Sequence, residues 1–174
     1  MLVDKFPWLL QPSLLTVFIR ALLAIICAGL IGYDRNARGS AAGIRTHVLV
    51  CVGAMLAMCT GEFTSMYYGG DASRIGAQVV SGIGFLGAGT IIVHKGHISG
   101  LTTAAGLWAS ACIGLAIGTG FYEAAIVGTL AVYFVEHGMR NLSKNIMKKY
   151  GHFDENRHPD KSTDIGADIM EIKE

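Results

Sequence analysis

The stretch SRIGAQVVSGIGFLGAGTIIV, residues 73–93, decides the fold of this chain. It is too apolar to be a loop and too rich in glycine to be an ordinary helix of a water-soluble protein. Small side chains recur along one helical face, so a neighbouring backbone can approach closely, which is how helices associate inside lipid. We therefore expect a membrane-spanning helix at the centre of a bundle. The residues expected at its helix-packing and dimer contacts are Ser73, Ala77, Gly82, Gly84, Gly87, Ala88 and Gly89.

The polar side chains of this stretch fall on nearly one stripe. Arg74, Gln78 and Ser81 are spaced i, i+4 and i+7 along the helix. Polar groups at membrane depth have to face protein or water. The stripe is therefore expected to face away from lipid.

The same stretch contains the pattern G-x-G-x-x-G at Gly82, Gly84 and Gly87. A dinucleotide site requires a strand before these glycines and an acidic residue about 20 residues later. Here the glycines lie inside an apolar run, and residues 101–108 contain no acid. Close helix packing therefore explains them better than nucleotide binding.

The composition of the 174 residues indicates insertion into a membrane. The chain is 52% hydrophobic and 16% charged, with a mean hydropathy of +0.46, which is more apolar surface than a soluble domain of this size can bury. A net charge of +1 and the lack of a basic aromatic patch give no indication of nucleic-acid binding. Four cysteines match neither a zinc site nor a disulfide framework, and we expect buried thiols at Cys27, Cys51, Cys59 and Cys112.

Four further apolar segments bring the expected number of spanning helices to five. They cover about 14–32, 44–60, 101–118 and 121–138. We expect residues 1–13 to be a retained interfacial lead-in, because they lack a basic region and a convincing cleavage site. The five-helix domain then covers 14–140. Residues 141–174 are expected to form a short basic amphipathic helix on the inner leaflet and a polar cytoplasmic tail.

Lysines and arginines predict the orientation, because short loops rich in them stay in the cytoplasm. The first and third connections and the C-terminal tail are basic, so the N-terminus is expected outside and the C-terminus inside. Among the outer charges, we expect Arg20 or Arg74 to pair with Glu62 or Glu123, since opposite charges in low dielectric are tolerated together and costly apart.

The inner charges leave two interpretations open. Arg38, Arg45 and His47 would suit an anionic lipid head group or an acidic partner, or the arginines only set topology. Asp34 is the one acid of its loop and cannot by itself make a magnesium site. We expect no cofactor, with Mg²⁺ unsupported by ligand spacing. The sequence contains no Ser or Cys flanked by a plausible His and an acid, so an enzyme is the least expected class.

Three segments of the chain resemble the signature segments of the MgtC/SapB family of bacterial inner-membrane proteins. They are GLIGYDRNARGSAAGIRTHVLV (29–50), SRIGAQVVSGIGFLGAGTIIV (73–93) and GLTTAAGLWASACIGLAIGTGFYEAAIVGT (100–129). The resemblance covers roughly residues 14–139 and implies a five-helix membrane domain. The matching positions are Asp34, Arg35, Gly43, Arg45, Thr46, His47, Arg74, Gln78, Ser81, Gly82, Gly84, Gly87, Gly89, Leu101, Thr102, Thr103 and Trp108.

The resemblance also implies a function. Members of the family are associated with survival under magnesium limitation and, in pathogens, with virulence, and action through other membrane proteins such as the F-type ATP synthase has been proposed. Several members carry a C-terminal domain similar to an ACT fold, and we expect no such domain in residues 141–174.

These observations predict an all-α polytopic membrane protein, a homodimer because small-residue faces are in surplus. The leading function is a regulatory or adaptor protein for adaptation to low magnesium. The alternative is a transporter or channel for Mg²⁺ or protons, with Arg20, Gln78 and Glu123 lining the path, but a divalent-cation pore normally exposes more carboxylates than these spans offer. The candidate polar cluster comprises Arg20, Asp34, Arg35, Arg38, Arg45, Thr46, His47, Arg74, Gln78, Ser81, Thr102, Thr103 and Glu123.

Overall fold

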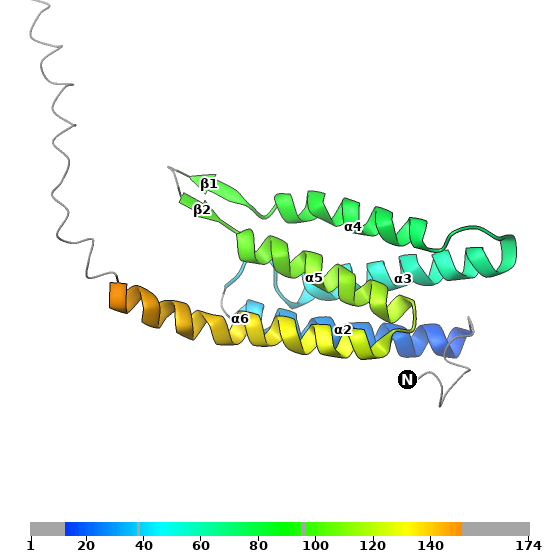
Figure 1. Cartoon of the computed structure of the whole chain (residues 1–174), viewed down its shortest axis with the longest axis horizontal. Coiled ribbons are helices and arrows are strands. Elements are labelled where there is room, and N and C mark those ends of the chain that lie inside the picture. Colours follow the sequence, from blue (N-terminus) through cyan, green and yellow to red (C-terminus); the bar gives the residue numbers. More distant parts are fainter. Residues whose placement is uncertain (1–12, 38, 95–96, 151–174) are drawn as a thin grey trace, which may run out of the picture. The chain divides into compact units, whose positions relative to one another are not determined.

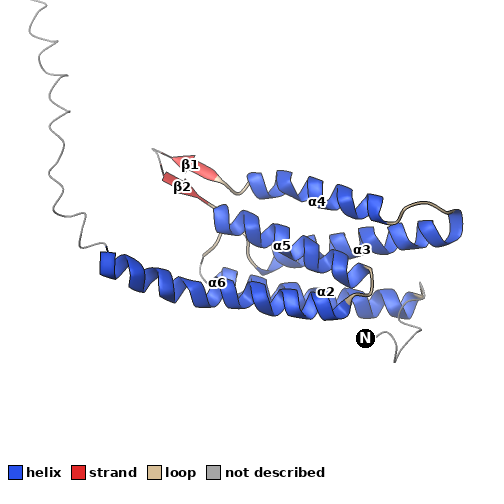
Figure 2. Ribbon diagram, viewed as in Figure 1, coloured by secondary structure: helices blue, strands red, loops and turns tan. Residues whose placement is uncertain are grey.

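The computed structural model describes residues 13–37, 39–94 and 97–150, which form five helices and one short hairpin (Figures 1 and 2). The chain divides into two units after His137, and the packing below is that of the first unit. The elements are α2 (Leu14–Ala37), α3 (Ile44–Tyr68), α4 (Ser73–Ala88), β1 (Ile92–His94), β2 (His97–Ser99), α5 (Leu101–Gly118) and α6 (Tyr122–Tyr150).

Helices α3 and α5 form the centre of the bundle, and each of them contacts both α2 and α4 (Figure 1). Their close approach depends on glycine. A Cβ atom at Gly114 would collide with the carbonyl oxygen of Cys51, and one at Gly118 would lie 2.8 Å from the carbonyl oxygen of Met55. Both obstacles are backbone atoms, so only residues without a side chain let α5 pack at this distance from α3.

The buried core is built from small and medium apolar side chains of four helices. Its members are Ala24, Cys27, Ala28 and Ile31 of α2, Cys51 and Met55 of α3, Ile113 and Ile117 of α5, and Tyr122 and Ala125 of α6. Large apolar side chains remain on the outside, among them Phe18, Ile26 and Leu49. Small side chains in the core and large apolar side chains on the surface are typical of helices surrounded by lipid.

Three of the described helices, α2, α3 and α5, are long and apolar enough to cross a membrane. The span predicted at 101–118 coincides with α5, which confirms that prediction. Helix α2 continues five residues beyond its predicted end, to Ala37, and α3 continues to Tyr68.

The prediction of a central helix over 73–93 was wrong in two respects. Helix α4 ends at Ala88, and Ile92 and Val93 belong to strand β1. It also lies at the side of the bundle, because it contacts α3 and α5 and buries only Gly76, Ile83 and Gly87. With 16 residues, it falls short of the ~20 that usually cross the hydrocarbon core.

The end of α4 is fixed by local hydrogen bonds. The side chain of Thr90 donates to the carbonyl oxygen of Gly87 at 2.8 Å, and the backbone amide of the same residue donates to that oxygen at 3.0 Å. The β-branched residues that follow favour an extended strand. The result is an antiparallel hairpin in which Val93 pairs with Ile98, where the sequence analysis expected the end of the helix and a basic connection.

The hairpin returns the chain to α5 through Gly100. This residue has φ +89°, a left-handed conformation that glycine adopts without strain. A Cβ atom here would also collide with the carbonyl group of Thr90. Glycine at this position therefore sets the angle at which the hairpin meets α5.

Helix α6 extends the predicted fifth span, 121–138, to Tyr150. The short helix expected after 138 is thus continuous with the span before it. The predictions for the lead-in at residues 1–12 and for the tail beyond 150 lie outside the described residues.

We predict that Gly114→Ala destabilises the bundle, because the new methyl group meets backbone atoms of α3 that cannot move aside. Overpacking of this kind costs about 1–3 kcal/mol. Thermal unfolding of the purified protein in detergent measures the effect. Gly53→Ala is the matched control, since no atom lies within 4 Å of a Cβ placed there. Equal unfolding temperatures for the two variants would contradict the close α3–α5 contact.

We further predict that the start of α4 loosens as the pH falls. Asp71 Oδ1 accepts hydrogen bonds from the side chain of Ser73 at 2.6 Å and from its backbone amide at 2.8 Å. These bonds hold the pKa of Asp71 below its usual range. Their contribution is therefore complete at neutral pH and is lost as the pH falls through the pKa of the folded state.

Hydrogen exchange of the amides at 72–76 tests this prediction when Asp71→Ala is compared with the parent chain at each pH. We expect faster exchange in the variant at neutral pH and equal exchange in acid, where the parent carboxylate is protonated. A difference that persisted unchanged into acid would assign the effect to something other than the carboxylate charge.

Candidate functional site

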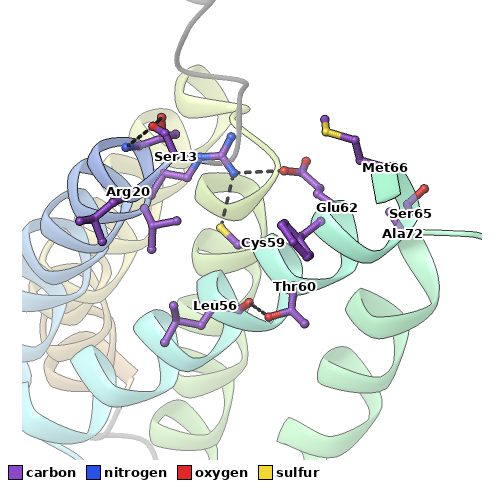
Figure 3. A pocket seen from close by; sticks show the side chains of 13 residues that line it. Ser13, Arg20, Leu56, Cys59, Thr60, Glu62, Ser65, Met66 and Ala72 are labelled. Carbon is purple, nitrogen blue, oxygen red and sulfur yellow. Dashed lines mark hydrogen bonds and ion pairs between the residues drawn. The ribbon is translucent and has the colours of Figure 1, made fainter. Parts of the chain in front are cut away.

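Arg20, near the start of α2, forms hydrogen bonds to residues of three other helices. Figure 3 shows its bonds to Glu62 and Cys59. Its side chain is almost fully buried, and Nη1 donates to Glu62 Oε2 of α3 at 3.1 Å. Nε donates to Tyr122 Oη of α6 at 3.2 Å, and Nη1 also donates to the carbonyl oxygen of Gly118 and to Cys59 Sγ. We call these five residues the Arg20 cluster. Of the pairings expected among the outer charges, the structure contains this one between Arg20 and Glu62.

The local sequence places Arg20 and Glu62 at the same level. Ser13 Oγ accepts a hydrogen bond from the backbone amide of Thr16 at 3.2 Å, which starts α2 two turns before Arg20. At the other end, Gly69 has φ +75° and its amide donates to Ser65, which ends α3 about two turns after Glu62. Because α2 and α3 are consecutive and antiparallel, the start of one lies beside the end of the other.

A pocket of about 840 Å³ opens beside the Arg20 cluster, between the first half of α2 and the last half of α3. Figure 3 shows the Arg20–Glu62 pair among the side chains that line it. Its walls are mostly apolar. The lining residues are Ser13, Leu14, Thr16, Val17, Arg20, Leu56, Cys59, Thr60, Glu62, Phe63, Ser65, Met66 and Ala72.

A second polar cluster lies toward the other end of α2, where Arg35 and His47 are both buried. Arg35 Nη2 donates to Thr103 Oγ1 at 2.6 Å, and His47 Nδ1 is 2.8 Å from Ser110 Oγ. Among the described residues, His47 Nε2 and Arg35 Nε have no hydrogen-bond partner. Helices α2, α3 and α5 thus each contribute polar side chains to this region.

Glu136 of α6 completes this second cluster, which we call the Arg35–His47 cluster: Arg35, His47, Thr103, Ser110 and Glu136. A Cβ atom on Gly106 would lie 2.8 Å from Glu136 Oε1 and 3.2 Å from His47 Cε1. Because Gly106 has no side chain, the Glu136 carboxylate and the His47 imidazole can both lie against α5 at this position. Both carboxylate oxygens of Glu136 are buried.

The Arg35–His47 cluster is chemically suited to holding a proton or a hydrogen-bonded polar group. It combines a permanent cation, an imidazole and a carboxylate inside the bundle, where such groups stabilise one another and are costly apart. Next to it, His137 Nδ1 lies 3.2 Å from Asp34 Oδ1, and the His137 ring stacks on Tyr133. Among the residues that the structure describes, no three His, Cys, Asp or Glu side chains are grouped to hold a metal ion.

The candidate polar residues, which the sequence analysis sorted into outer and inner charges, lie in three places in the structure. Arg20 joins one cluster, Arg35, His47 and Thr103 join the other, and Asp34 borders the second. Arg74, Gln78 and Ser81 are exposed on α4. Arg45, Thr46 and Thr102 are also exposed, Glu123 is half-buried with Oε2 inside, and Arg38 lies outside the described residues.

The small residues of α4 that were expected at packing contacts also lie in different environments. Gly87 packs against Ala104 of α5, and a Cβ atom there would lie 3.5 Å from the Ala104 Cβ atom. The other residues expected at packing contacts are exposed in the structure: Ser73, Ala77, Gly82, Gly84, Ala88 and Gly89.

Sequence reasoning missed Ser110 and Glu136 of the Arg35–His47 cluster, and Tyr122 and Gly118 of the Arg20 cluster. Ser110 lies four residues after Gly106 and four before Gly114 on the buried face of α5, so the sequence indicated only a helix-packing position there. Glu136 was expected at the inner face but was assigned no role. An acid inside an otherwise apolar helix was the available signal.

Three helices able to cross a membrane and two buried charged clusters define a polytopic helical membrane protein. Residues 21–145 match the sequence profile of the MgtC family, and the chain belongs to that family.

Two relatives support the same assignment. The chain is 44% identical over 140 residues to the putative magnesium transporter YhiD of Escherichia coli K12, covering 77% of this chain and 65% of that protein. It is 43% identical over 121 residues to Protein MgtC of Brucella abortus strain 2308, covering 68% of this chain and 49% of that protein. The chain thus spans between half and two thirds of the length of these relatives. No solved structure matches it.

We predict that Ser110→Ala destabilises the protein by removing the hydrogen-bond partner of His47 Nδ1. Hydrogen bonds between membrane helices contribute up to about 1–2 kcal/mol, and a buried imidazole left unpaired adds to the loss. Chemical or thermal unfolding in detergent measures it. Ser81→Ala removes the same group from an exposed position and should be neutral. If both substitutions were neutral, the His47–Ser110 bond would have no structural importance.

Proposed function

We propose that this chain is a regulatory or adaptor protein of the bacterial inner membrane that supports adaptation to low magnesium, and virulence in pathogens, by acting on other membrane proteins. The proposal includes five crossing segments, with α4 as a short one, the N-terminus outside and the C-terminus in the cytoplasm. Membership of the MgtC family supports the link to magnesium, and so does the name of the Escherichia coli relative, putative magnesium transporter YhiD.

The exposed polar stripe of α4 is the observation that carries the proposal. Arg74, Gln78 and Ser81 are exposed on this helix, and polar side chains at membrane depth favour protein or water over lipid. Gly82 and Gly84 have no atom within 4 Å of a Cβ placed on them. A second helix would therefore meet hydrogen-bonding groups and a smooth backbone on one face.

Two partners suit this face. A second copy of the chain would give the homodimer, and a helix of another membrane protein, with the F-type ATP synthase as the candidate that the family suggests, would give the regulated target. Either partner would cover the polar stripe.

The alternative function is transport of Mg²⁺ or protons. It is favoured by the name of the Escherichia coli relative, which calls that protein a putative magnesium transporter. A path of this kind would need Arg20, Gln78 and Glu123 to face common water. The pocket that Arg20 lines is formed mainly by α2 and α3 and does not include Gln78. This separation supports the regulator over the transporter.

We predict that the exposed stripe is required for function but not for folding. In bacteria that lack their own family member, the parent chain should restore growth at low magnesium, and the double variant Gln78→Leu, Ser81→Leu should not, because it removes the hydrogen-bonding groups. Val80→Leu, on the same helix, is the matched control. Membrane levels and unfolding temperatures of all three proteins should agree. Normal growth with the double variant would remove the support that α4 gives to this proposal.

Flux of Mg²⁺ and protons into proteoliposomes separates the two functions. The regulator predicts no flux above empty vesicles from protein shown to be folded. Saturable flux that is lost in the double variant Arg20→Ala, Glu123→Gln would establish the transporter instead.

A further inference from the structure

The pocket between α2 and α3 has the size and lining of a ligand site, and neither proposed function uses it. Its volume of about 840 Å³ lies in the range of small-molecule pockets, which are mostly apolar with a few polar groups. Leu14, Val17, Leu56 and Phe63 form its apolar walls, and Glu62 supplies a carboxylate.

The pocket lies at the ends of two membrane-crossing helices. It begins at Ser13, where α2 starts, and includes Met66, two residues before α3 ends. Tyr67 and Tyr68 are exposed beside it, and tyrosines are enriched at the level of the lipid head groups. A molecule in this pocket would therefore place one end among head groups and the other along the apolar walls.

The charge that reaches the pocket is negative. The side chain of Arg20 is 4% exposed and that of Glu62 is 32% exposed, so the cation is covered and the carboxylate is accessible. Arg20 directs its donors to protein acceptors on α3, α5 and α6. Glu62 accepts from Arg20 through Oε2 at 3.1 Å, and about a third of its side chain remains exposed.

The hydroxyl groups nearby do not compete for this role. Thr60 Oγ1 donates to the carbonyl oxygen of Leu56 at 2.8 Å, and Ser65 Oγ donates to that of Gly70 at 2.8 Å. The strongest polar feature of the pocket is thus a carboxylate oxygen, which prefers a charged N–H donor and repels an anion.

We infer that this pocket binds a membrane phospholipid whose head group carries a primary ammonium, with the ammonium donating to Glu62 and an acyl chain lying along Leu56 and Phe63. A quaternary ammonium has no N–H to donate, and a purely anionic head group would face the carboxylate. The site therefore selects among lipids of equal chain length by the head group alone.

Native mass spectrometry of the full chain, purified from vesicles of defined composition, tests the inference. The vesicles contain equal amounts of phosphatidylethanolamine, phosphatidylcholine and phosphatidylglycerol with the same acyl chains. We expect phosphatidylethanolamine to be retained about tenfold over the other two, as the loss of a charge-assisted hydrogen bond implies. Equal retention of the three lipids would overturn the inference.

Two variants locate the binding site. Glu62→Gln should abolish the preference among head groups, but it also removes the partner of Arg20 and can unfold the protein. Leu56→Trp fills the pocket without touching the ion pair and should reduce retention about tenfold. Leu49→Trp, on an exposed position of the same helix, is the matched control. Equal retention in the two tryptophan variants would place the lipid elsewhere and overturn the inference.

Competition with dodecylamine and dodecanol distinguishes the ammonium from the acyl chain. We expect dodecylamine to displace phosphatidylethanolamine from the parent chain and dodecanol to do so much less. If the two displaced it equally, the pocket would be a purely apolar groove and the role given to Glu62 would be wrong.

Discussion

The contact between α3 and α5 is the constraint on which the rest of the structure depends. Gly114 and Gly118 bring the α5 backbone against carbonyl groups of α3, and this short distance sets the rotation of both helices. Inside lipid, no general hydrophobic force presses helices together, so van der Waals packing of this kind determines the arrangement. The positions of α2 on one side and α4 on the other follow from it.

The two polar clusters use the same central pair in different ways. Near the start of α2, Arg20 reaches across to a carboxylate of α3 and to a backbone carbonyl at the end of α5. Near the end of α2, Arg35 reaches a hydroxyl at the start of α5, while His47 of α3 reaches another hydroxyl about two turns further along α5. Each cluster spans helices that are distant in sequence. Buried charges are therefore satisfied only when the whole bundle is assembled, which makes the assembled state distinct from partly packed alternatives.

The sequence allowed the class of protein and much of the helix pattern to be predicted, and the limits have physical causes. Residues 101–118 were assigned correctly because Gly100 and Gly120, both with positive φ, bound an uninterrupted apolar run. The end of α4 was missed because Thr90, Ile91 and Val93 are apolar or small enough to continue a spanning helix, and hydropathy does not distinguish that helix from a strand. The side position of α4 was missed because small residues serve equally for contacts within the chain and between chains.

Individual contacts across the bundle were harder to predict from the sequence than the helices were. The sequence favoured a pairing of Arg20 with an outer acid, because opposite charges in low dielectric are costly apart, but it left Glu62 and Glu123 as equal candidates. His47 and Ser110 are 63 residues apart, and their contact depends on how α3 and α5 are rotated. That rotation comes from glycine contacts whose depth no hydropathy pattern encodes.

The short length of α4 has a consequence for the bilayer itself. Its 16 residues rise about 24 Å, and the hairpin after it has outer backbone groups that need water or protein as partners. If α4 crosses the bilayer as proposed above, a bilayer of ordinary hydrocarbon thickness, about 30 Å, has to thin beside it or be replaced there by another protein surface. Membrane deformation on one side of the molecule then favours neighbours of matching hydrophobic length, so the lipids around the protein contribute to the choice of what gathers beside it.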